Sequence, residues 1–81
     1  MALGQIKKLD IAANEAVIAL EDGREVTVAF LPGANIEVHE PATMGTMGGT
    51  LADLQVGYWV EAEIHEHAGH ACSCSSLVCV S

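Results

Sequence analysis

The chain has few aromatic residues and no long apolar segment. Its 81 residues include one Trp, one Tyr and one Phe, so Val, Ile, Leu and Ala must fill the interior. A chain of this length forms a single domain, 1–81, because it cannot bury enough surface for a second core. Apolar residues still make up 51% of the sequence, which excludes a disordered chain. This composition suits a narrow, all-β barrel.

Positive charge is also scarce. Lys7, Lys8 and Arg24 stand against 11 acidic residues, and the formal net charge is −8. Such a surface repels phosphate backbones and anionic membranes, so we expect no nucleic-acid partner and no membrane partner. The acidic residues are spread along the chain, as is typical of a solvated surface. Cations are the small ligands that this charge favours.

Two further absences limit the function classes. No apolar run approaches the roughly 20 residues of a membrane helix, and Met1-Ala2-Leu3-Gly4 does not resemble a signal peptide, so we expect a soluble chain whose compartment the sequence does not specify. No nucleophile elbow, phosphate loop, zinc-protease helix or dinucleotide fingerprint occurs. We therefore predict that the protein is not an enzyme.

Alternation and turn residues predict five to six strands and one short helical turn near residues 50–55. Pro32-Gly33 is expected to end the third strand, because proline donates no ladder hydrogen bond, and residues 41–49 are expected to form a loop. Thr50 followed by Asp53 is typical of a capped helical turn, whose leucines would close a barrel end. The predicted strands are 5–11, 16–20, 25–30, 35–40, 58–66 and 71–80.

The turn at Asp22-Gly23 allows the register of the second and third strands to be predicted. A two-residue turn would set Ile18 against Thr27 and place apolar residues opposite polar ones. A three-residue loop with Gly23 in the left-handed conformation sets Ile18 against Val26 and Ala16 against Val28. We predict the three-residue loop.

The turn of the last hairpin decides where the cysteines point. A two-residue turn at Ala68-Gly69 would set His65 opposite Cys72 and build a metal site on the outer face. A three-residue loop, residues 67–69, would set Ile64 opposite Cys72 and turn the other face of the strand inward, because a slip of one residue exchanges the two faces. We favour the second register, which predicts that Cys72, Cys74, Val78 and Val80 face the core and that Cys79 points outward.

Several segments taken together carry a resemblance to a known family. They are Gly4–Asp10, Val17–Gly23, Glu25–Val28, Leu51–Gly57 and Val60–Glu63. The pattern resembles the small OB-like β-barrels of bacterial envelope proteins, which include domains of unknown function and the copper-binding protein of the periplasmic copper/silver efflux system. The resemblance implies an OB-like fold. That copper protein binds through one histidine, two methionines and a tryptophan, and the residues of those types in matching regions here are His39, Met44, Met47 and Trp59.

A second group of metal ligands lies in the last hairpin, within residues 64–74. His65 and His67 are two apart, so on a strand they point the same way, roughly 7 Å from each other. His70 follows in the turn, and Cys72 is a candidate fourth ligand. Imidazole and thiolate groups suit zinc, copper or nickel, and zinc or copper are the cofactors that we consider.

Two functions remain open. The first is a small non-catalytic binding module that binds a transition metal through the histidines of the last hairpin. The second is a structural or protein-interaction domain without a metal, which would present an unpaired strand edge or an exposed apolar patch, such as one near Trp59, to a protein partner.

Overall fold

The computed structural model describes residues 2–40, 45–67 and 71–80, and these residues form strands almost throughout. The predicted all-β class is confirmed, with six strands and one short helical turn. The elements are β1 (Ala2–Asp10), β2 (Glu15–Leu20), β3 (Glu25–Glu40), β4 (Gly45–Gly48), the 3-10 turn η1 (Leu51–Asp53), β5 (Trp59–Glu66) and β6 (Cys72–Cys79).

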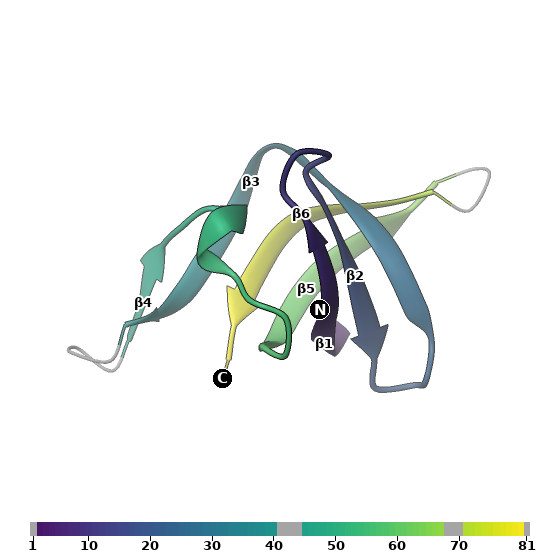
Figure 1. Cartoon of the computed structure of the whole chain (residues 1–81), viewed down its shortest axis with the longest axis horizontal. Coiled ribbons are helices and arrows are strands. Elements are labelled where there is room, and N and C mark those ends of the chain that lie inside the picture. Colours follow the sequence, from purple (N-terminus) through teal and green to yellow (C-terminus); the bar gives the residue numbers. More distant parts are fainter. Residues whose placement is uncertain (1, 41–44, 68–70, 81) are drawn as a thin grey trace.

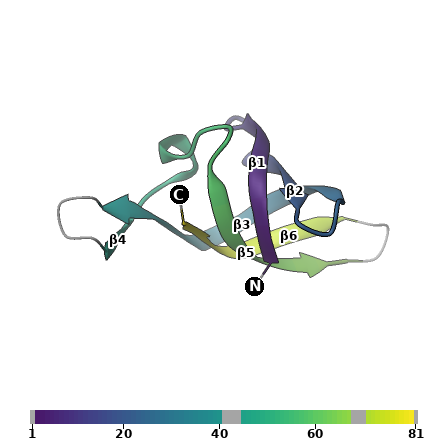
Figure 2. The same ribbon diagram turned by 90° about the horizontal axis from the view of Figure 1, so that it is seen from below.

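Five of the strands close into a barrel (Figures 1 and 2). The order along the sheet is β2-β1-β5-β6-β3-β4, and β2 also pairs with β3. Strands β3 and β6 run parallel, whereas the other neighbours are antiparallel. β4 is an additional strand that pairs with the end of β3 outside the closed ring.

Small aliphatic side chains fill the interior, as the shortage of aromatic residues predicts. In β5, Val60 and Ala62 are buried while Trp59, Glu61 and Glu63 are exposed. This confirms the alternation expected for that strand. The buried apolar residues are Ile6, Ala16, Ile18, Val28, Phe30, Ile36, Leu51, Leu54, Val60, Ala62, Cys74, Leu77 and Cys79.

The β2–β3 hairpin has the predicted register. Ile18 lies opposite Val26, and Ala16 lies opposite Val28. The Leu20 N–H donates to the Arg24 carbonyl over 2.7 Å, so the loop contains three residues, and Gly23 has φ +94°. The left-handed glycine and the pairing of apolar residues act together to fix this register.

The prediction that Pro32-Gly33 ends a strand is wrong. β3 continues from Glu25 to Glu40. Its ladder with β2 ends at Ala29, and its ladder with β6 skips from Phe30 to Asn35. Pro32 has no backbone N–H to donate, and neither β2 nor β6 pairs with β3 at this position. Gly33, at φ +76°, bends the strand there.

The predicted loop over residues 41–49 contains a strand. Gly45–Gly48 pairs with Glu37–Glu40, and Met47 lies opposite Val38. β4 and the end of β3 form a two-stranded ribbon that projects from the barrel (Figure 2). The residues of β4 show no alternation of polar and apolar side chains, so the sequence pattern did not predict this strand.

The helical turn forms where it was predicted. The Asp53 carboxylate accepts hydrogen bonds from the Thr50 backbone N–H at 2.8 Å and from the Thr50 hydroxyl at 3.3 Å. These bonds fix the start of η1. Leu51 and Leu54 are buried in the core, as expected of residues that close a barrel end.

Both predicted registers of the last hairpin are wrong. Glu66 lies opposite Cys72, and Ile64 lies opposite Cys74. The His67 N–H donates to the Ala71 carbonyl over 2.7 Å, so the three-residue connection lies one residue later than the predicted residues 67–69. The displacement changes each pairing by two residues, which preserves the face of each side chain, and Cys74 therefore points inward as expected.

A bulge reverses the faces further along β6. Glu63 pairs with Ser76 although Ile64 pairs with Cys74, so Ser75 is an extra residue. Beyond it, Leu77 and Cys79 are buried whereas Val80 is exposed. The predictions that Val78 and Val80 face the core and that Cys79 points outward are therefore wrong.

Within the described residues, the 3-10 turn η1 is the one helical element. The described residues contain no helix that is long and apolar enough to cross a membrane.

The close approach of β1 to β2 at Gly4 generates a prediction about stability. A Cβ atom on Gly4 would lie 2.6 Å from Ile18 Cγ2 and 2.8 Å from the Ala19 carbonyl oxygen. We expect Gly4→Ala to lower the free energy of unfolding by about 1–3 kcal/mol, the usual cost of overpacking. Urea denaturation measures the change. Gly48→Ala is the matched control, because no atom lies within 4 Å of its added Cβ, and an equal loss in both variants would contradict the explanation.

Candidate functional site

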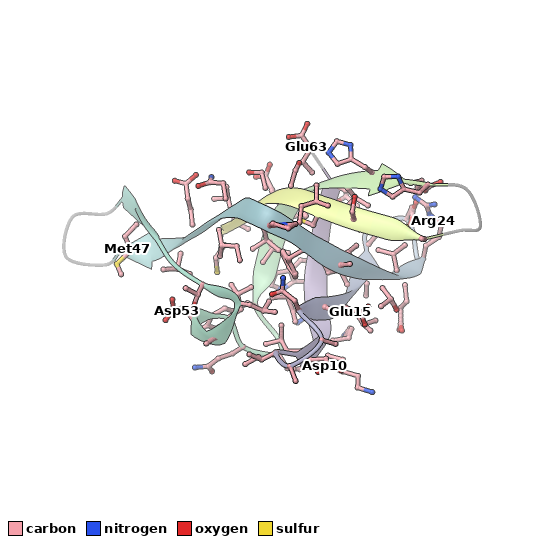
Figure 3. The ribbon with its side chains drawn as sticks, turned by 90° about the horizontal axis from the view of Figure 1, so that it is seen from above. Asp10, Glu15, Arg24, Met47, Asp53 and Glu63 are labelled. Atoms are coloured by element: carbon pink, nitrogen blue, oxygen red, sulfur yellow. The ribbon has the colours of Figure 1, made fainter. Side chains whose placement is uncertain are left out.

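The structure places His65 and His67 on one exposed face at the end of β5. Both histidine side chains are exposed, and the strand alternation carries both to the outer side of the barrel. Glu63 precedes them on the same face and points away from the barrel (Figure 3). This confirms the shared face that the spacing of two residues predicts.

Each histidine ring contacts a serine of β6. His65 Nε2 lies 2.9 Å from Ser75 Oγ, and His67 Nε2 lies 2.7 Å from Ser73 Oγ. In the strand register His65 lies opposite Ser73, so each ring leans to the serine two residues beyond its direct neighbour. Diagonal contacts of this kind are common between antiparallel strands. Each ring is therefore held by its own hydrogen bond.

These serine contacts define the chemistry of the histidine pair. When Nε2 carries the proton and donates to the serine oxygen, Nδ1 holds the lone pair. A metal-binding histidine commonly has its other ring nitrogen engaged in this way, which fixes the tautomer and the ring orientation. In that tautomer, Nδ1 of each histidine is the nitrogen that can bind a metal.

Cys72 lies on a different face of the hairpin from His65 and His67. It lies opposite Glu66 on the side of β6 that carries Cys74 inward, whereas Ser73 faces His67. His70, the third histidine of the cluster, lies outside the described residues, and so does Met44. Within the described residues no three His, Cys, Asp or Glu side chains converge as a metal site would require. Among the predicted ligands that the structure describes, it thus brings together His65 and His67.

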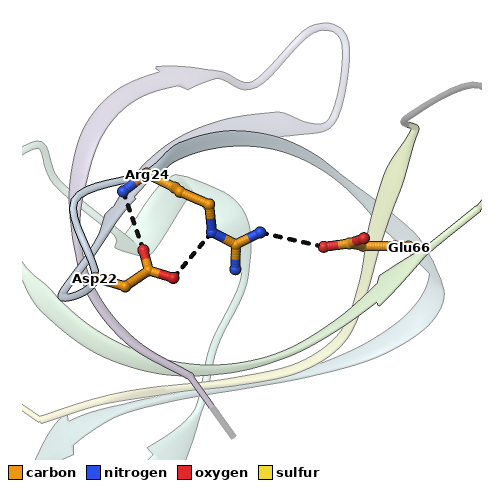
Figure 4. Close-up of polar contacts among 3 residues, drawn as sticks. All are labelled: Asp22, Arg24 and Glu66. Atoms are coloured by element: carbon orange, nitrogen blue, oxygen red, sulfur yellow. Dashed lines mark hydrogen bonds and ion pairs between the residues drawn. The ribbon is translucent and has the colours of Figure 1, made fainter.

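A second polar feature lies next to the histidines, at the barrel end. Arg24 Nε lies 2.9 Å from Asp22 Oδ2, and Arg24 Nη1 lies 3.4 Å from Glu66 Oε1. Arg24 reaches from the β2–β3 turn across the end of the barrel to β5 (Figure 4). We did not predict this bridge, because Arg24 and Glu66 are brought together only by closure of the barrel.

Arg24 lines two recesses. One has a volume of about 360 Å³ and lies along β3, lined by Arg24, Glu25, Val26, Thr27, Glu66 and Cys72. The other has a volume of about 410 Å³ and lies between the β2–β3 turn and β5. Barrel mouths are frequent ligand sites, and this mouth adjoins the histidine pair.

No protein-family model matches the chain, and no curated protein or solved structure is significantly similar to it. The family resemblance stays a prediction, and the site is interpreted from its own geometry.

The cysteines differ in exposure, which predicts different reactivity. Burial raises the pKa of the Cys74 thiol, so little of the reactive thiolate exists near neutral pH. Cys79 is buried as well, whereas Cys72 is half-buried. We expect iodoacetamide to modify Cys72 first in the folded protein and to reach the other two thiols only after unfolding in urea. Mass spectrometry of digested protein measures the order, and equal rates at Cys72 and Cys74 would contradict it. Cys72→Ser should leave a folded protein that reacts slowly.

The ion pair of Arg24 predicts a pH dependence. Hydrogen bonds from the Arg24 backbone N–H and guanidinium lower the pKa of Asp22 from its usual 3.8. The charged Asp22 carboxylate therefore stabilises the fold at pH values above 3.8. This contribution is lost as the pH falls through the lower pKa that Asp22 has in the folded protein. NMR titration of the Asp22 carboxyl carbon should give a pKa that rises towards 3.8 in Arg24→Gln. Lys8→Gln should leave it unchanged, and a rise in that variant instead would exclude Arg24 as the cause.

Proposed function

We propose that this protein is a small, non-catalytic binding module of OB-like type that binds a transition metal ion, zinc or copper, through the histidines of the last hairpin. The observation that carries the proposal is the histidine pair itself, His65 and His67, whose rings share one exposed face and are each oriented by a serine. His70 is the proposed third ligand. Cys72 is left out, because it lies on the other face of β6.

The strand order supports the OB-like part of the proposal. Around the ring the order is β1-β2-β3-β6-β5, with an antiparallel three-strand meander and a parallel pair β3–β6. Five-stranded Greek-key barrels of the OB type commonly act as binding modules, using loops at one end of the barrel. The β5–β6 hairpin that carries the histidines lies at such an end.

The chemistry of the ligands supports the choice of metal. Imidazole nitrogen is a borderline ligand that suits zinc and copper better than magnesium or calcium, which prefer oxygen. Two imidazoles alone form an incomplete site, so the proposed affinity is modest and depends on His70, water or a partner group to complete the coordination. The net charge of −8 raises the local concentration of cations around the protein.

The experiment is a metal titration of the reduced, ¹⁵N-labelled protein, first with zinc and then, without oxygen, with copper(I). We expect saturable shifts of the His65 and His67 resonances at one equivalent. The double variant His65→Ala/His67→Ala should weaken binding at least about tenfold, because loss of ligands or of their supporting contacts has effects of that size.

A matched control separates this site from other histidines. His39→Ala changes a histidine of β3, which is not part of the last hairpin, and should leave the metal affinity unchanged. His70→Ala tests the third ligand and should weaken binding as well. If the metal shifts were spread over the acidic residues, or survived in the double variant, the metal function would be excluded.

A further inference from the structure

β4 is the outermost strand of the sheet, and one of its edges is open. It pairs with the end of β3 on one side, and among the described residues no strand pairs with its other side. Figure 1 shows β4 at the outer margin of the projecting ribbon, with η1 on the inner side towards the barrel. The chain turns inward after β4, because Leu51 of η1 is buried in the core, and it leaves this edge uncovered.

The direction of the backbone groups of β4 follows from its register with β3. The two strands run antiparallel, and just beyond the end of β4 the Gly49 N–H donates to the Ile36 carbonyl over 2.8 Å. Hydrogen-bonded pairs alternate with non-hydrogen-bonded pairs between antiparallel strands, so the backbone groups of Met47 also point towards β3. Thr46 and Gly48 therefore present their N–H and C=O groups to the open edge.

An exposed apolar side chain lies beside this edge. Met47 is opposite Val38 in the ladder, so the two side chains share one face of the ribbon. Val38 is partly buried and packs against the core, whereas Met47 is 50% exposed. Figure 3 shows Met47 on the ribbon, away from the barrel. The apolar face that begins in the core therefore ends at an exposed thioether next to unpaired strand positions.

The absence of charge on β4 allows a second copy of the chain to approach it. β4 and its flanking residues, 41–50, contain no charged residue, although edge strands commonly carry charges that discourage pairing. The acidic residues of the ribbon, Glu37 and Glu40, belong to β3. If two β4 edges pair, the two β3 strands lie three strand spacings apart, about 14 Å, which exceeds the screening length of about 8 Å in physiological salt. Two copies, each with a net charge of −8, can therefore meet along β4 without bringing like charges into contact.

The open edge is also complementary to itself. Met47 lies midway between the two residues that point outward, Thr46 and Gly48. In an antiparallel pairing centred on Met47, the N–H and C=O groups of each Thr46 meet the C=O and N–H groups of Gly48 in the second copy. The two Met47 residues then form a non-hydrogen-bonded pair with Cα atoms about 4.5 Å apart, and their side chains contact each other on one face. A twofold axis closes this interface, as in most homodimers.

We propose that two copies of this chain associate through β4, which pairs antiparallel with β4 of the second copy and joins the two ribbons into one four-stranded sheet. Main-chain hydrogen bonds at Thr46 and Gly48, and the contact between two adaptable methionine side chains, hold the copies together. Interfaces of this small size form weak, transient complexes, so the association depends on protein concentration. The inference rests on the ribbon alone and does not depend on metal binding by the last hairpin.

The test is sedimentation velocity, together with ¹H–¹⁵N spectra, of the whole chain over about a hundredfold range of protein concentration. EDTA is present so that no metal links two copies through their histidines, and a reducing agent prevents disulfides between copies. We expect the sedimentation coefficient to rise from that of a monomer towards that of a dimer, and concentration-dependent shifts to be largest for the N–H groups of Thr46 and Gly48. Sedimentation as a monomer throughout, or shifts at the exposed residues Trp59 and Val80 in place of β4, would overturn the proposal.

Gly48→Pro and Gly48→Ala form a matched pair of variants at the open edge. Proline removes the N–H group that the pairing uses and is tolerated on an edge strand. It should weaken dimerisation at least about tenfold, the effect of losing two symmetry-related hydrogen bonds. Alanine keeps the N–H group, and no atom lies within 4 Å of the added Cβ, so the dimer affinity should change by no more than about threefold. Equal losses in the two variants would exclude main-chain pairing.

Met47→Lys separates pairing at β4 from a general effect of charge. It reduces the negative net charge of each copy, which by itself favours association of two acidic chains. In the proposed pairing it places two ammonium groups side by side at the twofold axis, so it should weaken dimerisation at least about tenfold. Met47→Leu keeps an apolar side chain of similar volume and should retain the dimer. A lysine variant that dimerises as well as the unchanged protein would contradict the proposal, and this comparison decides the question even if Gly48→Pro does not fold.

Discussion

The parallel ladder between β3 and β6 is the interaction on which the rest of the structure depends. It runs from Val28 and Cys72 to Glu37 and Val78, and it converts a three-strand meander and a separate hairpin into one closed ring. Parallel strands need a long connection between them, and the segment containing β4, η1 and β5 provides it. On its way this connection places Leu51 and Leu54 in the core. The β3–β6 pairing thus closes the barrel, and the connection that it requires supplies the leucines that close the barrel end.

Features that depend on neighbouring residues could be predicted from the sequence. The register at Asp22-Gly23 followed from the geometry of glycine and from the positions of Ile18 and Val26. The turn at Thr50 followed from a capping pattern, and the faces of β5 followed from alternation. In each case the residues that determine the structure lie within a few positions of one another, so tertiary contacts did not change the outcome.

Features that depend on distant partners could not be predicted in this way. The bulge at Ser75 allows β6 to pair with both β5 and β3. The sequence of β6 around Ser75 contains several serines, and it does not indicate which residue is the extra one. Likewise, Pro32 is tolerated in β3 only because both of its neighbours leave a gap there. For the candidate site, spacing predicted the common face of His65 and His67, but their serine partners and the Arg24–Glu66 bridge required knowledge of the strand pairing.

The position of β6 in the ring also sets an order of events during folding. Val28 pairs with Cys72 in the last strand, so a loop of roughly half the chain must close before this contact forms. The β1–β2–β3 meander is local and can form early, yet its β3 edge stays unsatisfied until the last strand arrives. Proteins dominated by such distant pairings fold slowly for their size. During synthesis on a ribosome, this domain can close only when residues 72–79 have left the exit tunnel, and until then the edge of β3 remains available to other chains.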